Sequence, residues 1–277
     1  MGPLLSGEVF SAATGNRGSK GAEAGSRAEG KGAQAEVRGT RAEGAGEGIS
    51  SVSLVLPAYN EEANLRRFLP RVLGWCRENL PAFEILVVDD GSTDGTAEVV
   101  EHFSRLDPRL RLLRHPRNLG YGAAVSTGIS SARGELLFLT DADGQFDIRE
   151  LGRFLRLLDG HDAVLGYRSP RRDPFHRLVL AWGWRQLVRW LLGVRVRDVD
   201  CAFKLLRRSS LKGLSLRSRG AAVSAELLSG MLKRGCRLRE EPVSHYPRRN
   251  GRATGARPAV ILRALRELLA VRKATGR

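Results

Sequence analysis

The sequence predicts an α/β fold in which helices flank a mostly parallel sheet. From Ser51 onward, short β-rich runs alternate with amphipathic segments, which is the pattern of successive strand–helix–strand units. Three of these runs end in polar, acid-rich loops. The chain has 277 residues, 42% of them hydrophobic, which is enough for one substantial domain and an appendage.

The expected elements follow one another at short intervals. Apolar and β-branched runs predict the strands, and apolar residues spaced three or four apart predict the helices. The strands are expected at 52–56, 84–88, 110–114, 135–140 and 162–167, with helices at 61–76, 94–105, 121–132 and 148–158 between them. Beyond Tyr167 the alternation breaks, and we expect helices at 175–192 and 221–233, a strand at 238–243 and a helix at 258–273.

Composition divides the chain into three parts. Residues 1–50 are rich in Gly, Ala, Ser, Arg and Glu and nearly free of large apolar side chains, so we expect a disordered, low-complexity leader. Residues 51–257 form the expected folded domain, and residues 258–277 a basic amphipathic tail. The leader holds six basic and six acidic residues, so the net charge of +16 lies in residues 51–277. Such basic character favours phosphate-bearing partners.

The three cysteines, Cys76, Cys201 and Cys236, are scattered and lack the spacing of a zinc site. We therefore expect a reducing, cytosolic setting. The first residues lack the charged region and apolar core of a signal peptide. No run of about 18 apolar residues predicts a membrane-spanning helix.

Two predicted helices combine apolar and basic side chains. Arginines interrupt the apolar run over 175–192, and the tail places Ile261, Leu265, Leu268 and Leu269 near one face. A helix of this kind can lie on an anionic membrane surface. It can equally dock on the sheet with a solvated charged face, and the sequence leaves both interpretations open.

Carboxylates gather where predicted strands end. The run over 134–140 leads directly into Asp141-Ala-Asp143, and the runs over 52–57 and 83–88 lead into two further acidic loops. Ligands of open α/β sheets bind beyond the carboxyl ends of the strands, so we expect one shared site. Asp141 and Asp143 are the predicted ligands of a hard divalent cation. An isolated Asp-x-Asp is more often a polar turn, but its place after a buried strand favours the functional interpretation.

Four motifs in order resemble family 2 glycosyltransferases, and most closely their dolichyl-phosphate mannose synthase and polyprenyl-phosphate glycosyltransferase branch. The motifs are Leu56-Pro-Ala-Tyr-Asn-Glu-Glu62, Val88-Asp-Asp-Gly-Ser-Thr-Asp-Gly-Thr96, Asn118-Leu-Gly-Tyr-Gly-Ala-Ala124 and Thr140-Asp-Ala-Asp-Gly-Gln145. The resemblance runs from about Ser51 to Gly255. It implies a glycosyltransferase A fold with a Rossmann-like sheet, so that 51–257 would be the catalytic domain.

The resemblance also implies a UDP- or GDP-linked hexose as donor, a Mg²⁺ or Mn²⁺ cofactor and inversion at the anomeric carbon. The residues that it assigns to the donor are Pro57, Tyr59, Asn60, Glu61, Asp89, Asp90, Asn118, Gly120, Gly122, Asp141 and Ala142. Those that it assigns to the metal are Asp141, Asp143 and Gln145. Structural roles are open as well: Asn60 and Asp94 suit helix caps, and Gly120 and Gly122 suit a tight turn.

The second half is expected to bind the acceptor. The resemblance places Lys204 near the acceptor pocket, although Cys201-Ala202 stands where the family commonly has Ser-Gly, and it folds Arg248 over the donor diphosphate. Basic residues that could hold an acceptor phosphate are Arg168, Arg171, Lys204 and Arg207. A hydroxyl acceptor would instead need a general base, for which Glu226 and Asp200 are candidates. Glu226 suits a structural salt bridge equally well.

These observations predict transfer of a hexosyl group to a polyprenyl phosphate by a cytoplasmic enzyme that lies peripherally at the inner face of the cell membrane. Trp182, Trp184 and Trp190 are expected near that membrane. The nearer alternative is transfer to a hydroxyl of a polysaccharide, glycolipid or small molecule, and a more distant one is a nucleotidyltransferase. We expect no nucleic-acid partner, because basic charge alone is nonspecific and no recognition motif accompanies it.

Overall fold

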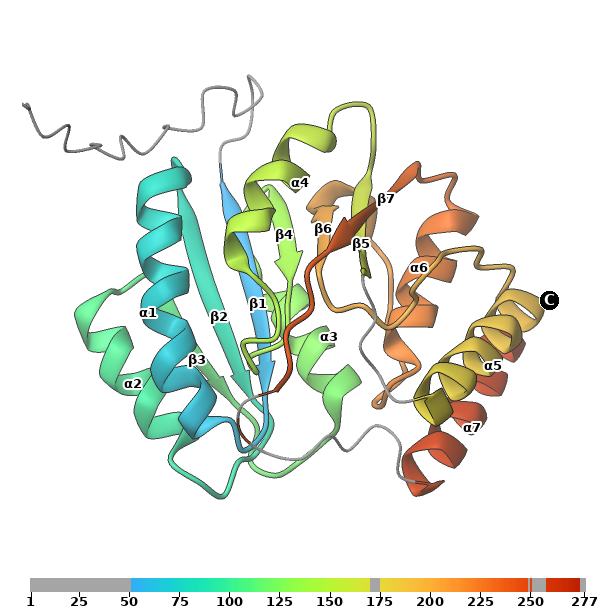
Figure 1. Ribbon diagram of the computed structural model, residues 1–277, viewed down its shortest axis with the longest axis horizontal. Coiled ribbons are helices and arrows are strands. Elements are labelled where there is room, and N and C mark those ends of the chain that lie inside the picture. Colours follow the sequence, from blue (N-terminus) through green and yellow to red (C-terminus); the bar gives the residue numbers. More distant parts are fainter. Residues whose placement is uncertain (1–50, 170–174, 249, 251–257, 275–277) are drawn as a thin grey trace, which may run out of the picture. The chain divides into compact units, whose positions relative to one another are not determined.

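A seven-stranded, mostly parallel sheet is the centre of the fold, as the sequence predicts (Figure 1). The computed structural model describes residues 51–169, 175–248, 250 and 258–274, so the predicted leader lies outside the described residues. The strands are β1 Val52–Ala58, β2 Phe83–Asp89, β3 Leu110–Arg114, β4 Leu136–Leu139, β5 Ala163–Arg168, β6 Lys204–Arg207 and β7 Leu238–Val243. Their order across the sheet is β3-β2-β1-β4-β6-β5-β7.

Helices cover both faces of the sheet (Figure 1). They are α1 Glu62–Asn79, α2 Thr96–Leu106, α3 Tyr121–Ser131, α4 Leu151–Leu157, α5 Phe175–Leu192, α6 Val223–Lys233 and α7 Pro258–Ala274. One buried cluster joins the sheet to α1, α2 and α4, and a second joins it to α3, α5, α6 and α7. The sheet therefore separates two apolar cores.

The central strands β1 and β2 are mostly apolar, apart from Ser53, Glu84 and Asp89, because both faces are covered. In β1, Leu54 belongs to the core under α1 and Val55 to the core under α3, and both are 0% exposed. Side chains of a strand alternate between faces, so strands buried on both sides lack polar alternation. This explains why the apolar runs in the sequence locate the parallel strands so well.

Strand β6 is absent from the sequence-based prediction. It runs antiparallel between β4 and β5, with Leu139 opposite Lys204 and Leu136 opposite Arg207. Lys204 therefore lies beside the carboxyl end of β4, and Arg207 lies beside its amino end. The Arg207 guanidinium donates there to the carbonyls of His161 and Leu158, and its role toward an acceptor phosphate stays a prediction.

The tail helix α7 docks on the protein. Ala264, Leu268 and Val271 are at most 5% exposed, so the docked interpretation is confirmed for residues 258–274, while Leu262 and Leu269 remain half exposed. Among the described residues, none of the helices has the length and hydropathy needed to cross a membrane.

Candidate functional site

The loops that follow β1 and β2 are joined to each other by hydrogen bonds. The Asn60 side chain accepts from the backbone N–H of Thr93 at 2.8 Å, and Asn60 has a φ of 55°. The first turns of α1 and α2 cap one another: Asp94 accepts from the Glu62 N–H at 3.3 Å, and Glu62 accepts from the Gly95 N–H at 3.0 Å. Asp94 thus caps a helix, which is one of the roles that the sequence left open, whereas the Asn60 side chain binds the neighbouring loop.

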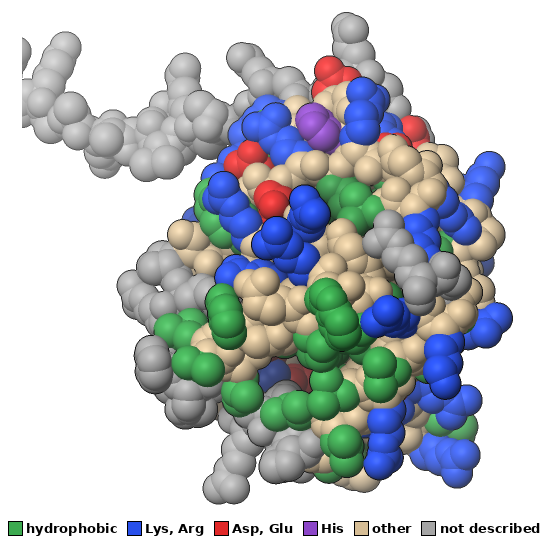
Figure 2. Space-filling model, turned by 90° about the vertical axis from the view of Figure 1, so that its right-hand side faces the viewer, with side chains coloured by type: hydrophobic (Ala, Val, Ile, Leu, Met, Phe, Trp, Pro, Cys, Tyr) green, Lys and Arg blue, Asp and Glu red, His purple; other side chains and the backbone are tan. Residues whose placement is uncertain are grey.

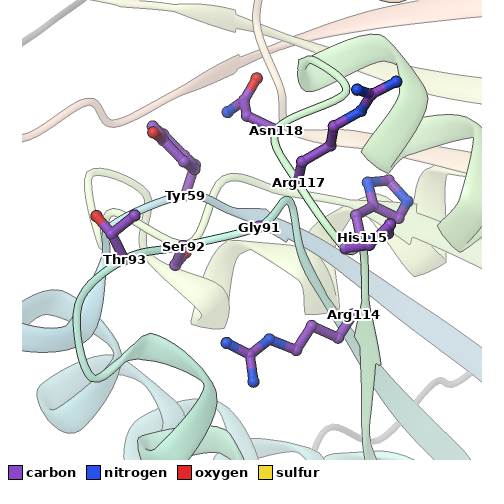
Figure 3. Close-up of a pocket in the computed structure, with 9 residues that line it drawn as sticks. Tyr59, Gly91, Ser92, Thr93, Arg114, His115, Arg117 and Asn118 are labelled. Carbon is purple, nitrogen blue, oxygen red and sulfur yellow. The ribbon is translucent and has the colours of Figure 1, made fainter.

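These loops frame an open pocket of about 670 Å³ at the carboxyl ends of β1, β2 and β3 (Figure 3). Tyr59 lies on one side, the segment that follows β3 lies on the other, and Gly91 lies between them. Of the predicted donor residues, Tyr59 and Asn118 line the pocket. The other residues that line the pocket are Gly91, Ser92, Thr93, Arg114, His115, Pro116 and Arg117.

Asp89 and Asp90 shape the pocket from beneath. Asp90 accepts hydrogen bonds from the backbone N–H groups of Leu119 and Gly120 at 2.9 and 2.8 Å, and lies 2.7 Å from Nδ1 of His115. Asp89 accepts from the Ser92 N–H at 2.8 Å and lies 3.3 Å from Nε of Arg114. Both are at most 3% exposed, so they fix the loops, and contact with a nucleotide base stays a prediction.

Three glycines permit close backbone contacts at this edge. Gly91 has a φ of +71°, and a Cβ there would lie 2.3 Å from the carbonyl carbon of Arg117. A Cβ at Gly120 or Gly122 would meet carbonyl oxygens of residues 218–219 at 2.2 or 2.3 Å. The approach that Gly120 and Gly122 allow is therefore to the chain itself, and their contact with a nucleotide stays a prediction.

The predicted metal residues lie beside this pocket, in the loop after β4. Asp141 accepts from the Tyr121 hydroxyl at 3.1 Å. Asp143 accepts from Nη2 of Arg248 at 3.0 Å, and the same nitrogen donates to Glu61 at 2.9 Å. Arg248 thus reaches the acidic corner from the far end of the chain and neutralises part of its charge.

The remaining predicted donor and metal residues occupy other positions. Gln145 donates its side-chain amide to the Tyr246 carbonyl at 2.8 Å, which attaches the loop around Arg248. Pro57 is buried inside β1 opposite Val88. Ala142 is 1% exposed and belongs to the core. Their roles toward a donor or metal stay predictions.

The electrostatics of the corner suit a divalent cation. The pKa of Asp141 is raised to about 7, first because the surrounding protein desolvates its carboxylate and second because Asp143 lies nearby. A cation between the two would favour their ionised forms. Within the described ranges, no three His, Cys, Asp or Glu side chains gather as a metal site. Two carboxylates suffice for Mg²⁺ or Mn²⁺ when substrate phosphates complete the coordination.

The basic residues proposed for the acceptor are mostly engaged. Arg168 binds Asp198 through two nitrogens at 2.7 and 2.9 Å. Lys204 is 1% exposed, donates to the Cys201 carbonyl, and has a lowered pKa because of its burial. It still adds positive charge near Asp141. Arg171 lies outside the described residues.

The two candidate bases differ sharply. Both oxygens of Glu226 accept from backbone N–H groups, those of Arg217 and Ser218, at 2.8 to 3.1 Å. These bonds attach Glu226 to residues 217 and 218, and its role as a base stays a prediction. Asp200 is exposed, and its pKa is raised by desolvation and by the charge of Asp198.

Several site residues were not predicted. Tyr121 lies inside the third motif, but its contact with Asp141 depends on how α3 is placed. His115 and Arg114 carry no motif; their only signal is their position at the end of a strand, where site residues gather. Trp184, which was expected near a membrane, is partly buried against the core and donates to Asp200 at 3.1 Å, and its position at a membrane stays a prediction.

The chain is similar in sequence to known proteins. Residues 53–214 match the model of the family described as Glycosyl transferase family 2. The undecaprenyl-phosphate 4-deoxy-4-formamido-L-arabinose transferase of Pseudomonas paraeruginosa (strain DSM 24068 / PA7) is 35% identical over 209 residues, which cover 73% of this chain and 60% of that protein. The dodecaprenyl-phosphate galacturonate synthase of Rhizobium johnstonii is 30% identical over 204 residues, with 72% and 60% covered. The chain thus spans 60% of the length of these curated relatives.

A solved structure supports the fold. The glucosyl-3-phosphoglycerate synthase of Mycobacterium tuberculosis, in complex with Mn²⁺, uridine diphosphate and phosphoglyceric acid, superimposes with a TM-score of 0.65 at 20% identity. The match covers 83% of this chain and 81% of that one. At this identity the likeness establishes a shared architecture and leaves substrates open.

Proposed function

Because the chain belongs to glycosyl transferase family 2, we propose that it transfers a hexosyl group, with inversion, from a UDP- or GDP-linked sugar to a polyprenyl phosphate. One observation carries this proposal. The pocket beside Tyr59 and the acidic corner at Asp141 and Asp143 lie at the same edge of the sheet. Tyr121, the first residue of α3, joins the pocket wall to the acidic corner, because its hydroxyl donates to Asp141.

The donor would lie across both halves of this site. Tyr59 and Asn118 would border the nucleoside, and Asp141 and Asp143 would hold the Mg²⁺ or Mn²⁺ that accompanies the diphosphate. The metal would neutralise the negative charge that grows on the departing diphosphate. Arg248 already contacts Asp143, so its guanidinium is within a side chain's reach of that diphosphate and would bind it bidentately.

A phosphate acceptor suits the charges of the second half. Its oxygen is anionic near neutral pH, so no general base has to remove a proton. Lys204 supplies positive charge at the acceptor side of Asp141, and Arg168 lies at the end of β5, held by Asp198. The curated relatives named above carry undecaprenyl- and dodecaprenyl-phosphate in their names, which supports a lipid phosphate here.

The outer surface of α5 and α7 supports a peripheral position at the inner face of the membrane. Figure 2 shows hydrophobic side chains gathered on this side of the molecule, with Lys and Arg side chains beside them. The exposed members on the two helices are Val179, Leu180, Trp182, Trp190, Leu262 and Leu269. Apolar side chains flanked by basic ones favour an anionic lipid surface. Arg272 also lies over the Trp190 ring at 5.3 Å, which joins the two helices.

A panel of nucleotide sugars tests the proposal. Each would be incubated with undecaprenyl phosphate and Mg²⁺ or Mn²⁺, and the released nucleoside diphosphate and the lipid product would be measured together. We expect one donor to give both products in equal amounts, and Asp143→Ala to give neither. Release of pyrophosphate would instead identify a nucleotidyltransferase.

Asp200 favours a hydroxyl acceptor as the second candidate. It is exposed, and its pKa is raised above the ordinary value, first by desolvation and then by the charge of Asp198, which is the direction that suits a general base. Asp200→Asn separates the two candidates. Loss of turnover by about 10²-fold or more would indicate a general base, whereas a small loss would favour the phosphate acceptor.

A further inference from the structure

Residues 217–220, which we call the strap, lie directly on the N-terminus of α3. The backbone N–H of Gly122 donates to the Arg219 carbonyl at 2.8 Å. A Cβ at Gly122 would lie 2.3 Å from the Ser218 carbonyl oxygen and 2.8 Å from that of Gly220. Only glycine allows an approach this close, so the strap and α3 are packed backbone to backbone.

Two carboxylates from different helices hold the strap. Glu226 of α6 accepts from the first two N–H groups of the strap. Glu267 of α7 accepts from the N–H of Gly220 with both oxygens, at 3.0 and 3.1 Å. Arg263, one turn before Glu267, donates to it at 3.1 Å, and its Nη2 would lie 3.2 Å from a Cβ at Gly120. The tail helix thus meets the start of α3 through the strap and through Arg263.

The start of α3 serves both halves of the candidate site. Its preceding residues Leu119 and Gly120 donate to Asp90, Asn118 lines the pocket, and Tyr121 donates to Asp141. A shift of this segment would therefore move the pocket wall and the partner of a predicted metal ligand together.

We propose that Glu267 is a positioning residue for the donor. Through the strap it holds residues 118–122 in the arrangement that receives the nucleotide diphosphate, so the tail helix is a working part of the site. Glu267 is 17% exposed at its side chain, and its hydrogen bonds among the described residues are to Gly220 and Arg263, neither of which we assign to the substrate. The inference rests on the proposed function, since it concerns the same donor.

The test compares Glu267→Ala with Glu267→Gln in the full chain. The glutamine keeps an oxygen that can accept from Gly220, so it should restore what alanine loses. Glu101→Ala, which removes an exposed carboxylate from α2, is the control for charge. Amide hydrogen exchange of peptides over residues 117–124 would be measured without ligand, and the dissociation constants of UDP and GDP would be measured with Mn²⁺.

We expect Glu267→Ala to raise exchange over 117–124, and to weaken binding of the preferred nucleotide, by roughly two- to tenfold, the loss that one hydrogen bond causes. Glu267→Gln and Glu101→Ala should match the wild type. Exchange that rises only within α7 and the strap, or an unchanged nucleotide affinity, would overturn the proposal.

The exchange experiment separates this inference from the proposed function. If the wild type binds neither nucleotide, the proposed function fails, while exchange over 117–124 still decides whether Glu267 holds that segment. If Glu267→Ala does not fold, Glu267→Asp replaces it, because the shorter carboxylate withdraws from Gly220 without losing its charge.

Discussion

Replacing Asp141 with asparagine should stabilise the metal-free protein while removing its response to metal. In the native state the pKa of Asp141 is about 7, against an ordinary value of 3.8, because of desolvation and the nearby charge of Asp143. Between these values the folded state holds a proton that the unfolded state has lost, so stability falls as the pH rises from about 4 to 7. Asparagine does not titrate, so this fall should be missing from the variant.

The size of the effect follows from the pKa difference. One pKa unit corresponds to about 1.4 kcal/mol, so the full difference sets an upper limit of about 4 kcal/mol above pH 7. The loop can relax, and we expect about half of this limit. A gain of about 2 kcal/mol corresponds to a rise in Tm of roughly 4–8 °C for a domain of this size.

Thermal unfolding at pH 5 and pH 8, with and without Mn²⁺ plus UDP or GDP, measures both effects. We expect Asp141→Asn to have a higher Tm than the wild type at pH 8 without metal. Addition of metal and nucleotide should leave the Tm of the variant unchanged. The wild type should be stabilised by that addition. A variant that melts lower at pH 8, or that still responds to metal, would refute the reasoning.

Three further predictions concern neighbouring features. Arg248→Gln should bind Mn²⁺ alone roughly fivefold more tightly in a direct titration, because the guanidinium occupies Asp143; equal affinity would contradict this competition. Gly91→Ala should lower the free energy of unfolding in urea by about 3 kcal/mol or more, because Gly91 has a φ of +71° and a Cβ there would lie 2.3 Å from the backbone. Its control is Gly160→Ala, which has a φ of +67° and no neighbour within 4 Å and should lose about 1–2 kcal/mol. Equal losses in the two variants would count against the packing argument. The double variant Leu262→Ser and Leu269→Ser should partition to anionic vesicles roughly tenfold less than the wild type. The control Leu106→Ser, on α2, should partition like the wild type. Identical partitioning of the double variant and the control would exclude α7 from the membrane surface.

The sequence predicts the first half of the fold closely because its strands are buried on both faces. β1 and β2, expected at 52–56 and 84–88, run from Val52 to Ala58 and from Phe83 to Asp89 and are buried along almost their whole length. β6 was not predicted from the sequence because it has only four residues and begins with Lys204, a charged side chain that is buried only through its place in the fold. A run so short has no periodicity to detect.

The site was predicted as a region rather than as a set of contacts. Motifs place Tyr59, Asn118 and the Asp141–Asp143 pair at one edge because parallel strands end together there. They cannot show which partner a side chain chooses. Asp90 binds backbone N–H groups thirty residues away, and Glu226 and Glu267 bind the strap. These contacts depend on loops between distant elements, which leave no local pattern in the sequence.

The position of Mn²⁺ in crystals grown with UDP or GDP tests the central claim most directly, because anomalous scattering identifies the metal independently of activity. The account predicts one strong peak at ligand distance from the carboxylates of Asp141 or Asp143, with the nucleoside between Tyr59 and Asn118 and Arg248 turned toward the diphosphate. A metal bound elsewhere, or a nucleotide outside that pocket, would contradict it.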